Sequence, residues 1–439
     1  MKYDLFFKLA KEAGIEQAEL RINQKREFSM SLFHGEMDKY EVNDGWSFFA
    51  RGLIKGKMGS ASISTWNKAN AQYLVNEIVN NAKVIEDEDP AFIFEGSKKY
   101  HKVSTFNKEL ENVDLNKKIA DLRELEQLIA KGDKRVIEVG GVAYVEHKGM
   151  TTLLNSKGLK LTRKTNYFFM YGQAVAKEND QVKSGFDMFF ENNYSKLDVK
   201  ALAKTIVEAA TAQLGGEACK SGPYKVVLDR DVVASLLPAY ISSADSEEVQ
   251  KHTSLFIGKV GQKIASKKIT IEDKPLAKTI FATYFDDEGV ATYNKPIIKN
   301  GVLEGYLYNL TTAAKEGVQT TGNASGGAKM GVAPHFLVMK PGKSSKEDLF
   351  KTVGDGVYIT EVSGLHAGLD ARTGNFSLQA SGFLIKDGKK DHPLDVITVS
   401  GNLLKLFEDI LLVGNDSKLA QNAIETPSVL VKKLVVGGK

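Results

Sequence analysis

The sequence has little cysteine, no long apolar run and no closely spaced histidines. Its single cysteine, Cys219, excludes an internal disulfide and leaves no thiolate pair for a structural metal. No apolar stretch approaches the roughly twenty residues of a membrane span. Asp4 interrupts the amphipathic run from Met1 to Leu9, unlike the apolar core of a signal peptide. We therefore expect a cytoplasmic protein that makes no contact with a membrane.

Recognisable catalytic motifs are also missing. The seven histidines never fall three to five positions apart, so no helix presents two imidazoles to a zinc ion. No serine lies in a Gly-x-Ser-x-Gly turn, and no Gly-x-x-x-x-Gly-Lys loop is present to hold phosphate. The acidic run from Asp286 to Glu288 carries oxygens that suit a hard cation. Three adjacent carboxylates on one extended segment do not converge on one ion, however, so a turn is favoured.

Charge gives little reason to expect a nucleic-acid partner. The 439 residues carry a formal net charge of +4, which is too small for the electrostatic footprint of a nucleic-acid binder. One stretch combines basic and aromatic side chains, as a platform for single strands does: Lys157, Lys160, Arg163, Lys164, Tyr167, Phe168 and Phe169. Alternating charge on a strand is more typical of its solvated face. Direct nucleic-acid binding is therefore not expected.

The first half of the chain shows the same order of patterns twice. Leu5, Leu9 and Ala13 predict a short helix, alternation from Ala18 to Ala50 predicts strands, and a stripe from Ala71 to Ile85 predicts a closing helix. The acidic run Glu86 to Pro90 ends this unit. A second unit begins with Asp114 as a helix cap, continues through strand-like runs between 136 and 175, and closes with a helix capped by Asp198.

From Pro223 onward short strands and glycine turns dominate, with a helix starting at Asp229. Asn300-Gly301 and Asp387-Gly388 predict two-residue hairpin turns, because both pairs tolerate positive φ. We predict an α+β fold in three domains. Residues 1–100 and 101–220 each form a helix, an antiparallel meander and a helix, and residues 221–439 form a β-rich domain.

The stretch from Gly364 to Gly388 is the most distinctive in the chain. A glycine-rich loop feeding a strand can leave backbone groups open to an extended peptide. Candidate substrate-binding residues are therefore Gly364, His366, Thr373, Gly374 and Phe376. A structural turn in which His366 caps backbone groups is equally consistent with the pattern.

Several stretches resemble the TldD/PmbA family, and specifically its PmbA (TldE) branch. They are DDEGVATYNKPIIKNGVLEGYL at 286–307, Thr-Gly-Asn at 321–323, GLHAGLDARTGNFSLQASGFLI at 364–385, and the closing strand from Pro427. The resemblance implies an α+β first half, a β-rich C-terminal domain, and a dimer that cleaves unfolded peptides. In that dimer a zinc-bearing TldD-type subunit pairs with a PmbA-type subunit, and a homodimer is possible when the partner is absent.

The resemblance also indicates where a zinc helix would lie. In TldD the motif His-Glu-x-x-x-His precedes a segment that here begins at Thr253, which places Leu237, Pro238 and Ser242 at its key positions. Leu237 and Pro238 offer neither ligand nor base, and we expect the proline to disrupt a continuous helix. The third family ligand, a cysteine, has no counterpart between Leu411 and Ser417. No metal site and no catalytic residue are therefore expected in this chain, and zinc is expected in the partner.

Three readings of function stay open. The first is a subunit without a zinc site that forms the substrate chamber of a heteromeric metallopeptidase. The second is a peptidase that is active alone through an atypical site. The third is a regulatory binding protein, as the family's older name, modulator of DNA gyrase, suggests; the low net charge argues against direct DNA contact.

Overall fold

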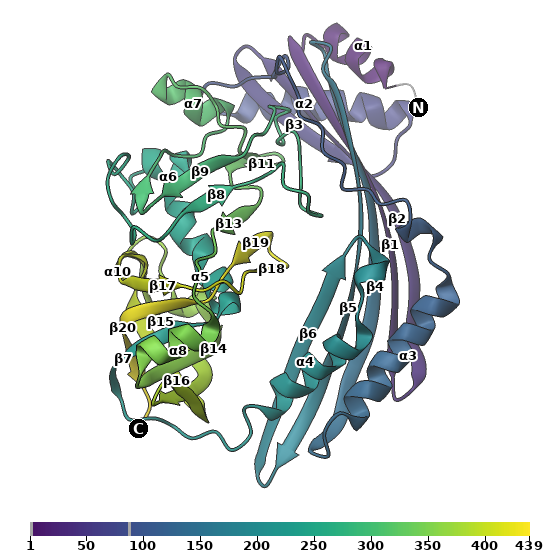
Figure 1. Ribbon diagram of the computed structural model, residues 1–439. Coiled ribbons are helices and arrows are strands. Elements are labelled where there is room, and N and C mark those ends of the chain that lie inside the picture. The colour runs from purple at the N-terminus through teal and green to yellow at the C-terminus, as the bar shows by residue number, and fades with distance from the viewer. Residues whose placement is uncertain (1–2, 87–88) are drawn as a thin grey trace.

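The N-terminal half is built on one long antiparallel sheet (Figure 1). The computed structural model describes residues 3–86 and 89–439, so Asp87 and Glu88 of the predicted boundary run lie outside the described residues. The sheet has the order β3-β2-β1-β4-β5-β6, and the pairing of β1 with β4 joins the two predicted meanders. Its strands are β1 (Gln17–Phe33), β2 (Glu36–Ile54), β3 (Lys57–Ile63), β4 (Val136–Asn155), β5 (Lys160–Glu178) and β6 (Gln181–Glu191).

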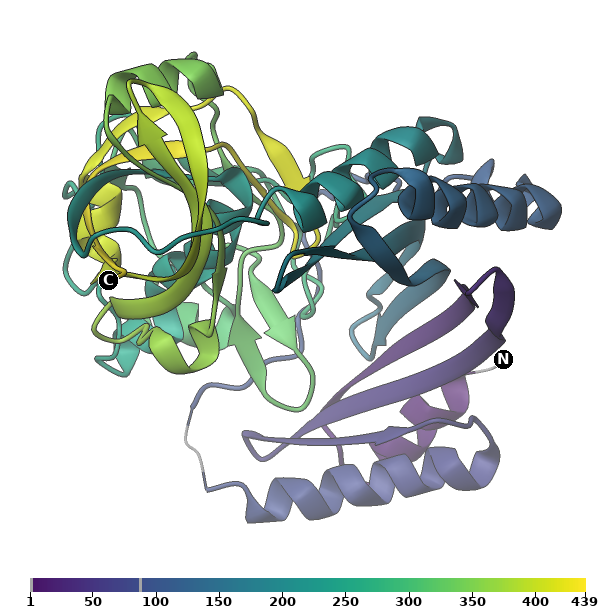
Figure 2. The same cartoon turned by 90° about the horizontal axis from the view of Figure 1, so that it is seen from below.

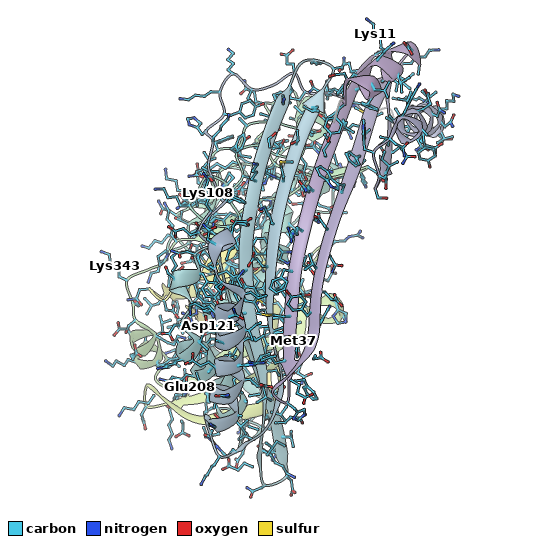
Figure 3. The ribbon with its side chains drawn as sticks, turned by 90° about the vertical axis from the view of Figure 1, so that its right-hand side faces the viewer. Lys11, Met37, Lys108, Asp121, Glu208 and Lys343 are labelled. Carbon is cyan, nitrogen blue, oxygen red and sulfur yellow. The ribbon has the colours of Figure 1, made fainter. Side chains whose placement is uncertain are left out.

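Four helices pack against one face of this sheet. They are α1 (Asp4–Glu12), α2 (Lys68–Val84), α3 (Leu115–Lys131) and α4 (Val199–Thr211). Even-numbered residues of β1 contact both pairs of helices. Leu20 and Ile22 pack with α1 and α2, whereas Met30 and Leu32 pack with the pair α3 and α4. Because side chains alternate along a strand, these residues share one face. Figure 3 shows Asp121 of α3 and Glu208 of α4 over the lower strands, and Figure 2 shows the sheet twisting between the two helix pairs.

The predicted order of helix, strands and helix is confirmed in both units. Asp114 accepts hydrogen bonds from the N–H groups of Asn116 and Lys117, and Asp198 accepts one from Ala201, so each caps its helix. Gly14 follows α1 with φ +79°, the left-handed conformation expected after a helix end. The α+β class is therefore correct, although the two units share a single sheet.

The C-terminal half contains two further six-stranded sheets. One has the order β10-β9-β8-β13-β19-β18, with strands Val302–Leu303, Lys295–Lys299, Ile271–Asp273, Leu337–Met339, Ile424–Thr426 and Lys418–Ala420. The other has the order β16-β15-β14-β7-β20-β17, with strands Lys389–Asn402, Asn375–Lys386, Gly356–Ser363, Gly222–Leu228, Val429–Gly437 and Ile410–Val413. Pairing of β16 with β20 closes the second sheet on itself.

Helix α5 (Arg230–Ile241) lies between these two sheets and contributes to the largest apolar core of the described residues. The remaining helices are short: α6 (Ser246–Gln250), α7 (Leu310–Glu316), α8 (Lys346–Val353), α9 (Leu365–Gly368) and α10 (Leu403–Glu408). Single 3₁₀ turns span Leu110–Asn112, Tyr194–Lys196 and Ser242–Ala244. A small hairpin pairs β11 (Ala324–Gly326) with β12 (Met330–Val332).

Both predicted hairpin turns are confirmed. Asn300 and Gly301 have φ of 49° and 82°, and Asp387 and Gly388 have φ of 52° and 72°. These positive values are those of a tight turn whose twist matches its strands. Within residues 3–86 and 89–439, every helix is too short or too polar to cross a membrane.

The face of the long sheet opposite α1 to α4, here called the open face, meets the C-terminal half at one end. The open face carries the odd-numbered side chains of β1 and their cross-strand neighbours. There Leu153 and Leu161 pack against Tyr284 and Phe285. Beyond this contact the open face continues along the strands to their opposite ends (Figure 1).

Candidate functional site

Helix α5 carries the three positions aligned with a zinc motif. Asp229 caps the helix by accepting a hydrogen bond from the Asp231 N–H at 3.1 Å. Leu237 is fully buried in the core between the two C-terminal sheets, whereas Pro238 and Ser242 are exposed. The Ser242 hydroxyl donates to the Ala239 carbonyl at 2.9 Å. An apolar buried side chain, a proline ring and a hydroxyl already bonded to the backbone do not fit a zinc ion.

The expectation that Pro238 disrupts the helix is wrong. α5 runs without interruption from Arg230 through Ile241. Pro238 lacks the N–H that would bond the Ala234 carbonyl, but Asn422 Nδ2 donates to that carbonyl at 3.2 Å instead. A side chain far away in the sequence therefore replaces the missing hydrogen bond.

A polar cluster that the sequence did not reveal surrounds the start of α5. Lys346 Nζ lies 2.9 Å from Asp229 Oδ2, 2.9 Å from the Tyr358 hydroxyl and 3.5 Å from Asp416 Oδ2. Tyr358 also donates a short hydrogen bond to Asp229, and burial together with this carboxylate raises the pKa of Tyr358. Its members come from α8, β14 and two loops, so only the fold brings them together. The cluster ties α8 to the start of α5.

The glycine-rich loop around α9 is held by Asp370. Asp370 accepts hydrogen bonds from the Arg372 N–H at 2.9 Å and the Thr373 hydroxyl at 2.9 Å. Gly364 has φ +79° at the start of α9, and Gly374 and Phe376 are buried beneath the loop. His366 is exposed, and no hydrogen bond to its side chain occurs in the described part of the chain. Of the five candidates, Gly364, His366 and Thr373 are therefore the ones that face solvent.

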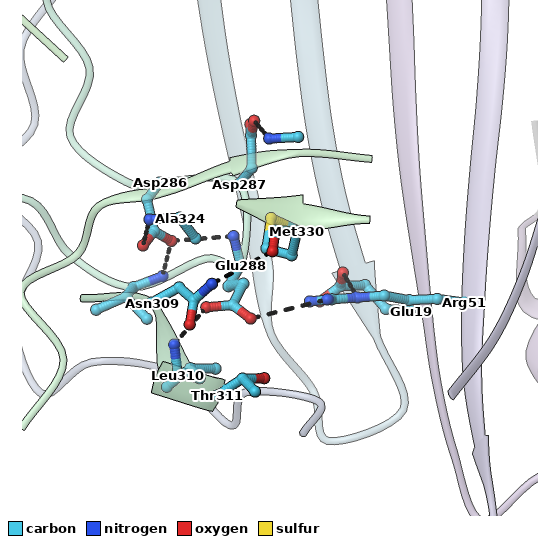
Figure 4. A network of polar contacts seen from close by, with 12 residues as sticks. Glu19, Arg51, Asp286, Asp287, Glu288, Asn309, Leu310, Thr311, Ala324 and Met330 are labelled. Atoms are coloured by element: carbon cyan, nitrogen blue, oxygen red, sulfur yellow. Dashed lines mark hydrogen bonds and ion pairs between the residues drawn. The ribbon is translucent and has the colours of Figure 1, made fainter. Parts of the chain in front are cut away.

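The acidic run from Asp286 to Glu288 joins the two halves of the molecule (Figure 4). Its carboxylates point to different partners, as the sequence suggested. Asp286 accepts hydrogen bonds from three backbone N–H groups, those of Glu288, Val290 and Ala324. Burial, with the neighbouring Glu288, raises the pKa of Asp286 to about 8, although the three N–H donors act in the opposite direction.

The other two carboxylates of this run reach the open face of the long sheet. Asp287 Oδ1 lies 3.1 Å from Arg21 Nη1, and Glu288 Oε1 lies 3.9 Å from Arg51 Nη1. Arg51 is itself buried and pairs with Glu19 at 2.7 Å. Glu288 Oε2 also accepts the Leu310 N–H at the start of α7. The segment forms the predicted turn, in which the Gly289 N–H donates to the Asp286 carbonyl at 3.0 Å, and its side chains also make a buried ionic junction.

The Thr-Gly-Asn element has a similar structural role. Asn323 Nδ2 donates to the buried Asp273 at 2.8 Å and to the Ala333 carbonyl at 2.9 Å. Lys295 lies 3.1 Å from the same aspartate, and Gly322 adopts φ +68°. These contacts orient the loop.

The predicted basic and aromatic stretch does not form one surface. Lys157, Lys160 and Lys164 are exposed as expected, but Arg163 turns to the C-terminal half and lies 5.1 Å from the Phe285 ring. Phe168 is fully buried under the helices, whereas Phe169 lies on the opposite, open face. The interpretation of Arg163 as part of a solvated face is therefore wrong.

A groove of about 750 Å³ separates the edge of the long sheet from the C-terminal half. One wall is the continuous run from Val182 to Asp187 in β6 together with residues of α4. The opposite wall includes Thr360, Glu361, Ser363 and Gln379 to Ser381. Asp229 to Asp231 at the start of α5 also line it. The groove thus connects the aligned helix with the long sheet, and it is large enough for a peptide segment.

Comparison with known proteins covers nearly the whole chain. Residues 18–82, 108–214 and 221–438 match domain 1, the central domain and the C-terminal domain of the PmbA/TldA metallopeptidases. The metalloprotease PmbA of Escherichia coli O157:H7 is 24% identical over 96% of this chain and 92% of its own length. A PmbA homologue of Haemophilus influenzae is 22% identical over 98% of this chain and 94% of its own length.

Solved structures show the same architecture. A Thermotoga maritima protein described as a modulator of DNA gyrase superposes with a TM-score of 0.90 and is 32% identical, covering 99% of both chains. TldE from Thermococcus kodakarensis superposes with a TM-score of 0.89 at 24% identity, again over 99% of both chains. The chain thus has the α+β fold of these solved structures. Its sequence relatives are named metalloproteases. The chain belongs to the PmbA/TldD metallopeptidase family.

Proposed function

We propose that this chain is the subunit without a zinc site in a two-subunit TldD/TldE-type metallopeptidase that degrades unfolded peptides. The observation that carries the proposal is the chemistry of α5. Leu237 is buried among apolar side chains, Pro238 has no ligand atom, and the Ser242 hydroxyl is bonded to the helix backbone. No step of hydrolysis is therefore assigned to this chain.

The proposed contribution of the chain is to bind and enclose substrate. The groove between β6 and the C-terminal half lies beside the start of α5, and the exposed loop residues Gly364, His366 and Thr373 are proposed to contact peptide. Gly374 and Phe376 would act by supporting that loop from below. A TldD-type subunit would supply zinc, and a homodimer would form in its absence. The single cysteine fits the cytoplasm as the compartment.

The test is cleavage of a quenched fluorescent unfolded peptide by this chain alone, by a TldD-type partner alone and by the two together. We expect cleavage only with the partner present, stimulation by this chain, and loss with a chelator. Ser242→Ala and Pro238→Ala in this chain should leave the rate of the mixture unchanged, because neither residue acts on substrate or metal. His366→Ala should raise KM without changing kcat.

Three results would favour the other readings. Zinc-dependent cleavage by the purified chain alone, or loss of activity in Ser242→Ala, would make it a peptidase in its own right. Tight DNA binding with a steep dependence on salt concentration would favour a regulatory role on DNA.

A further inference from the structure

The open face of the long sheet changes character along its length, away from the junction with the C-terminal half. On β1 and β2 it is polar, with Ser29, Ser31, Lys39 and Glu41. On β5 and β6 the same rows of the sheet carry large apolar side chains: Tyr167, Phe169, Tyr171, Phe186, Met188 and Phe190. The exposed face of an antiparallel sheet is ordinarily polar. The aromatic part therefore calls for an explanation that the polar part does not.

The aromatic side chains, here called the aromatic series, make ring contacts in two separate groups. The Tyr171 and Phe186 rings lie 5.7 Å apart, Phe169 and Tyr171 lie 6.1 Å apart, and Phe190 lies 6.1 Å from Phe281 of the C-terminal half. Phe186 is 50% exposed. Tyr167, Phe169 and Tyr171 on β5 are partly buried, and the His147 ring of β4 lies 4.9 Å from the Tyr167 ring and 5.5 Å from the Phe169 ring.

The edge of the same sheet is open at this place. Within residues 3–86 and 89–439, β6 pairs with β5 only, so its other edge has no strand beside it. On the helix side, α4 approaches so closely that a Cβ at Gly185 would lie 2.2 Å from the Ala210 nitrogen. A ligand can therefore reach β6 only from its edge or from the open face, and the groove of about 750 Å³ runs along that edge.

The charges beside the groove distinguish between possible ligands. Lys183 pairs with Asp395 at 2.6 Å, and Lys418 lies 3.7 Å from Asp187. Arg230 and Asp229 also line the groove and offset each other in charge. Asp231 and Glu361 add further negative charge, and no ion pair to either occurs in the described residues. An acidic groove disfavours a polyanion such as single-stranded nucleic acid. An extended polypeptide, by contrast, matches both an open strand edge and alternating apolar contacts.

We propose that an extended peptide adds to the free edge of β6 and lays alternate apolar side chains beside Phe186 and Tyr171. Because side chains alternate along a strand, an added strand places every second residue on the open face, next to the aromatic series. The preferred ligand is a peptide with apolar residues at alternate positions and without excess acidic charge. The inference rests on the proposed function, because it names where this subunit holds the peptide substrate.

The experiment measures binding of a fluorescein-labelled peptide to the full-length chain without a partner, by anisotropy. In the probe peptide leucine alternates with threonine, with lysines at one end. We expect Phe186→Ser to weaken binding about tenfold, and Phe186→Ser with Tyr171→Ser to weaken it further. The matched control is Tyr73→Ser on α2, an aromatic residue 51% exposed and distant from the groove, which should leave binding unchanged. A peptide with serine in place of leucine should bind weakly to every variant.

Several outcomes would overturn the inference. These are equal affinity of Phe186→Ser and wild type, tighter binding of a single-stranded oligonucleotide than of the peptide, or conversion of a dimer to monomers by Phe186→Ser with peptide affinity unchanged. The last would identify the aromatic surface as a contact between subunits. Phe186-dependent binding without partner-stimulated cleavage would refute the proposed function alone. Cleavage by the complex with KM unaltered in Phe186→Ser would refute this inference alone.

Discussion

The two ends of the open face differ in the side chains they carry and in how fully the rest of the chain covers them. At one end charged residues of the sheet are buried against the C-terminal half, and Glu19, Arg51 and Glu288 form a compact ionic junction. At the other end the sheet carries aromatic residues that this chain covers only in part. The charged end thus holds the two halves together, whereas the aromatic end leaves large apolar side chains partly exposed.

Truncation of two neighbouring residues gives the largest expected contrast. Phe168→Ala should lower the free energy of unfolding by about 4 kcal/mol, because its ring is fully buried against Tyr144 and Tyr194. Phe169→Ala, one position along the same strand, should lower the free energy of unfolding by about 1 kcal/mol or less, because its ring is only partly buried. Urea denaturation of both variants measures the difference. Equal costs would mean that the open face is as tightly packed as the helix-covered face.

A substitution at the ionic end should lower the free energy of unfolding nearly as much as Phe168→Ala. Arg51→Met should lower the free energy of unfolding by about 3 kcal/mol, because Glu19 and Glu288 then remain buried without their cation. Denaturant unfolding of the single variant and of Arg51→Met with Glu19→Leu tests this reason. The double variant should regain part of the loss. If it is less stable than the single variant, the unpaired carboxylate is not the source of the cost.

A third prediction concerns pH at this same end. Because the pKa of Asp286 is raised to about 8, the folded protein holds a proton that the unfolded chain releases above about pH 4. The stabilising effect is complete below about pH 4 and is lost as the pH rises through about 8. Asp286→Asn cannot ionise. The substitution should lower the free energy of unfolding by about 2 kcal/mol at pH 5, because a buried hydrogen-bond acceptor is lost, and by less at pH 9.

Unfolding curves of wild type and Asp286→Asn across this pH range provide the measurement for that prediction. Phe168→Ala serves as the control, because its cost should not depend on the ionisation of Asp286. A constant difference between Asp286→Asn and wild type from pH 5 to pH 9 would show that Asp286 is ionised throughout.

Local features of the fold were predictable from sequence, whereas long-range pairing was not. Asp114, Asp198 and the Asn300-Gly301 turn act through neighbours in the chain, so their patterns identified helices and a hairpin correctly. The pairing of β1 with β4 joins segments that no local pattern connects. Strand β6 was missed although its signal is local, because Val182, Phe186 and Met188 alternate with polar or small residues and lie on one face.

The candidate site shows the same difference between local features, which the sequence predicts, and long-range contacts, which it does not. The missing zinc ligands at Leu237, Pro238 and Ser242 follow from residue type alone. The continuity of α5 depends on Asn422, and the burial of Glu288 depends on Arg51, and neither partner is near in sequence. The separation of Phe168 from Phe169 could have been predicted from the alternation of side chains along a strand, once that stretch was read as a strand.

The smallest expected effect lies at the boundary between the polar and the aromatic parts of the open face. The Ser29 hydroxyl is buried and has no hydrogen-bond partner in the described residues, whereas Ser31, two positions along, donates to Asp38 at 3.1 Å. Ser29→Ala removes an unsatisfied polar group and should leave stability unchanged or raise it by up to about 1 kcal/mol. Ser31→Ala removes an exposed hydrogen bond and should lower stability by about 0.5 kcal/mol. Denaturant unfolding of both variants measures whether each substitution raises or lowers the free energy of unfolding. A loss of stability in Ser29→Ala as large as that in Ser31→Ala would place a bound partner at the Ser29 hydroxyl and move the boundary toward the aromatic strands.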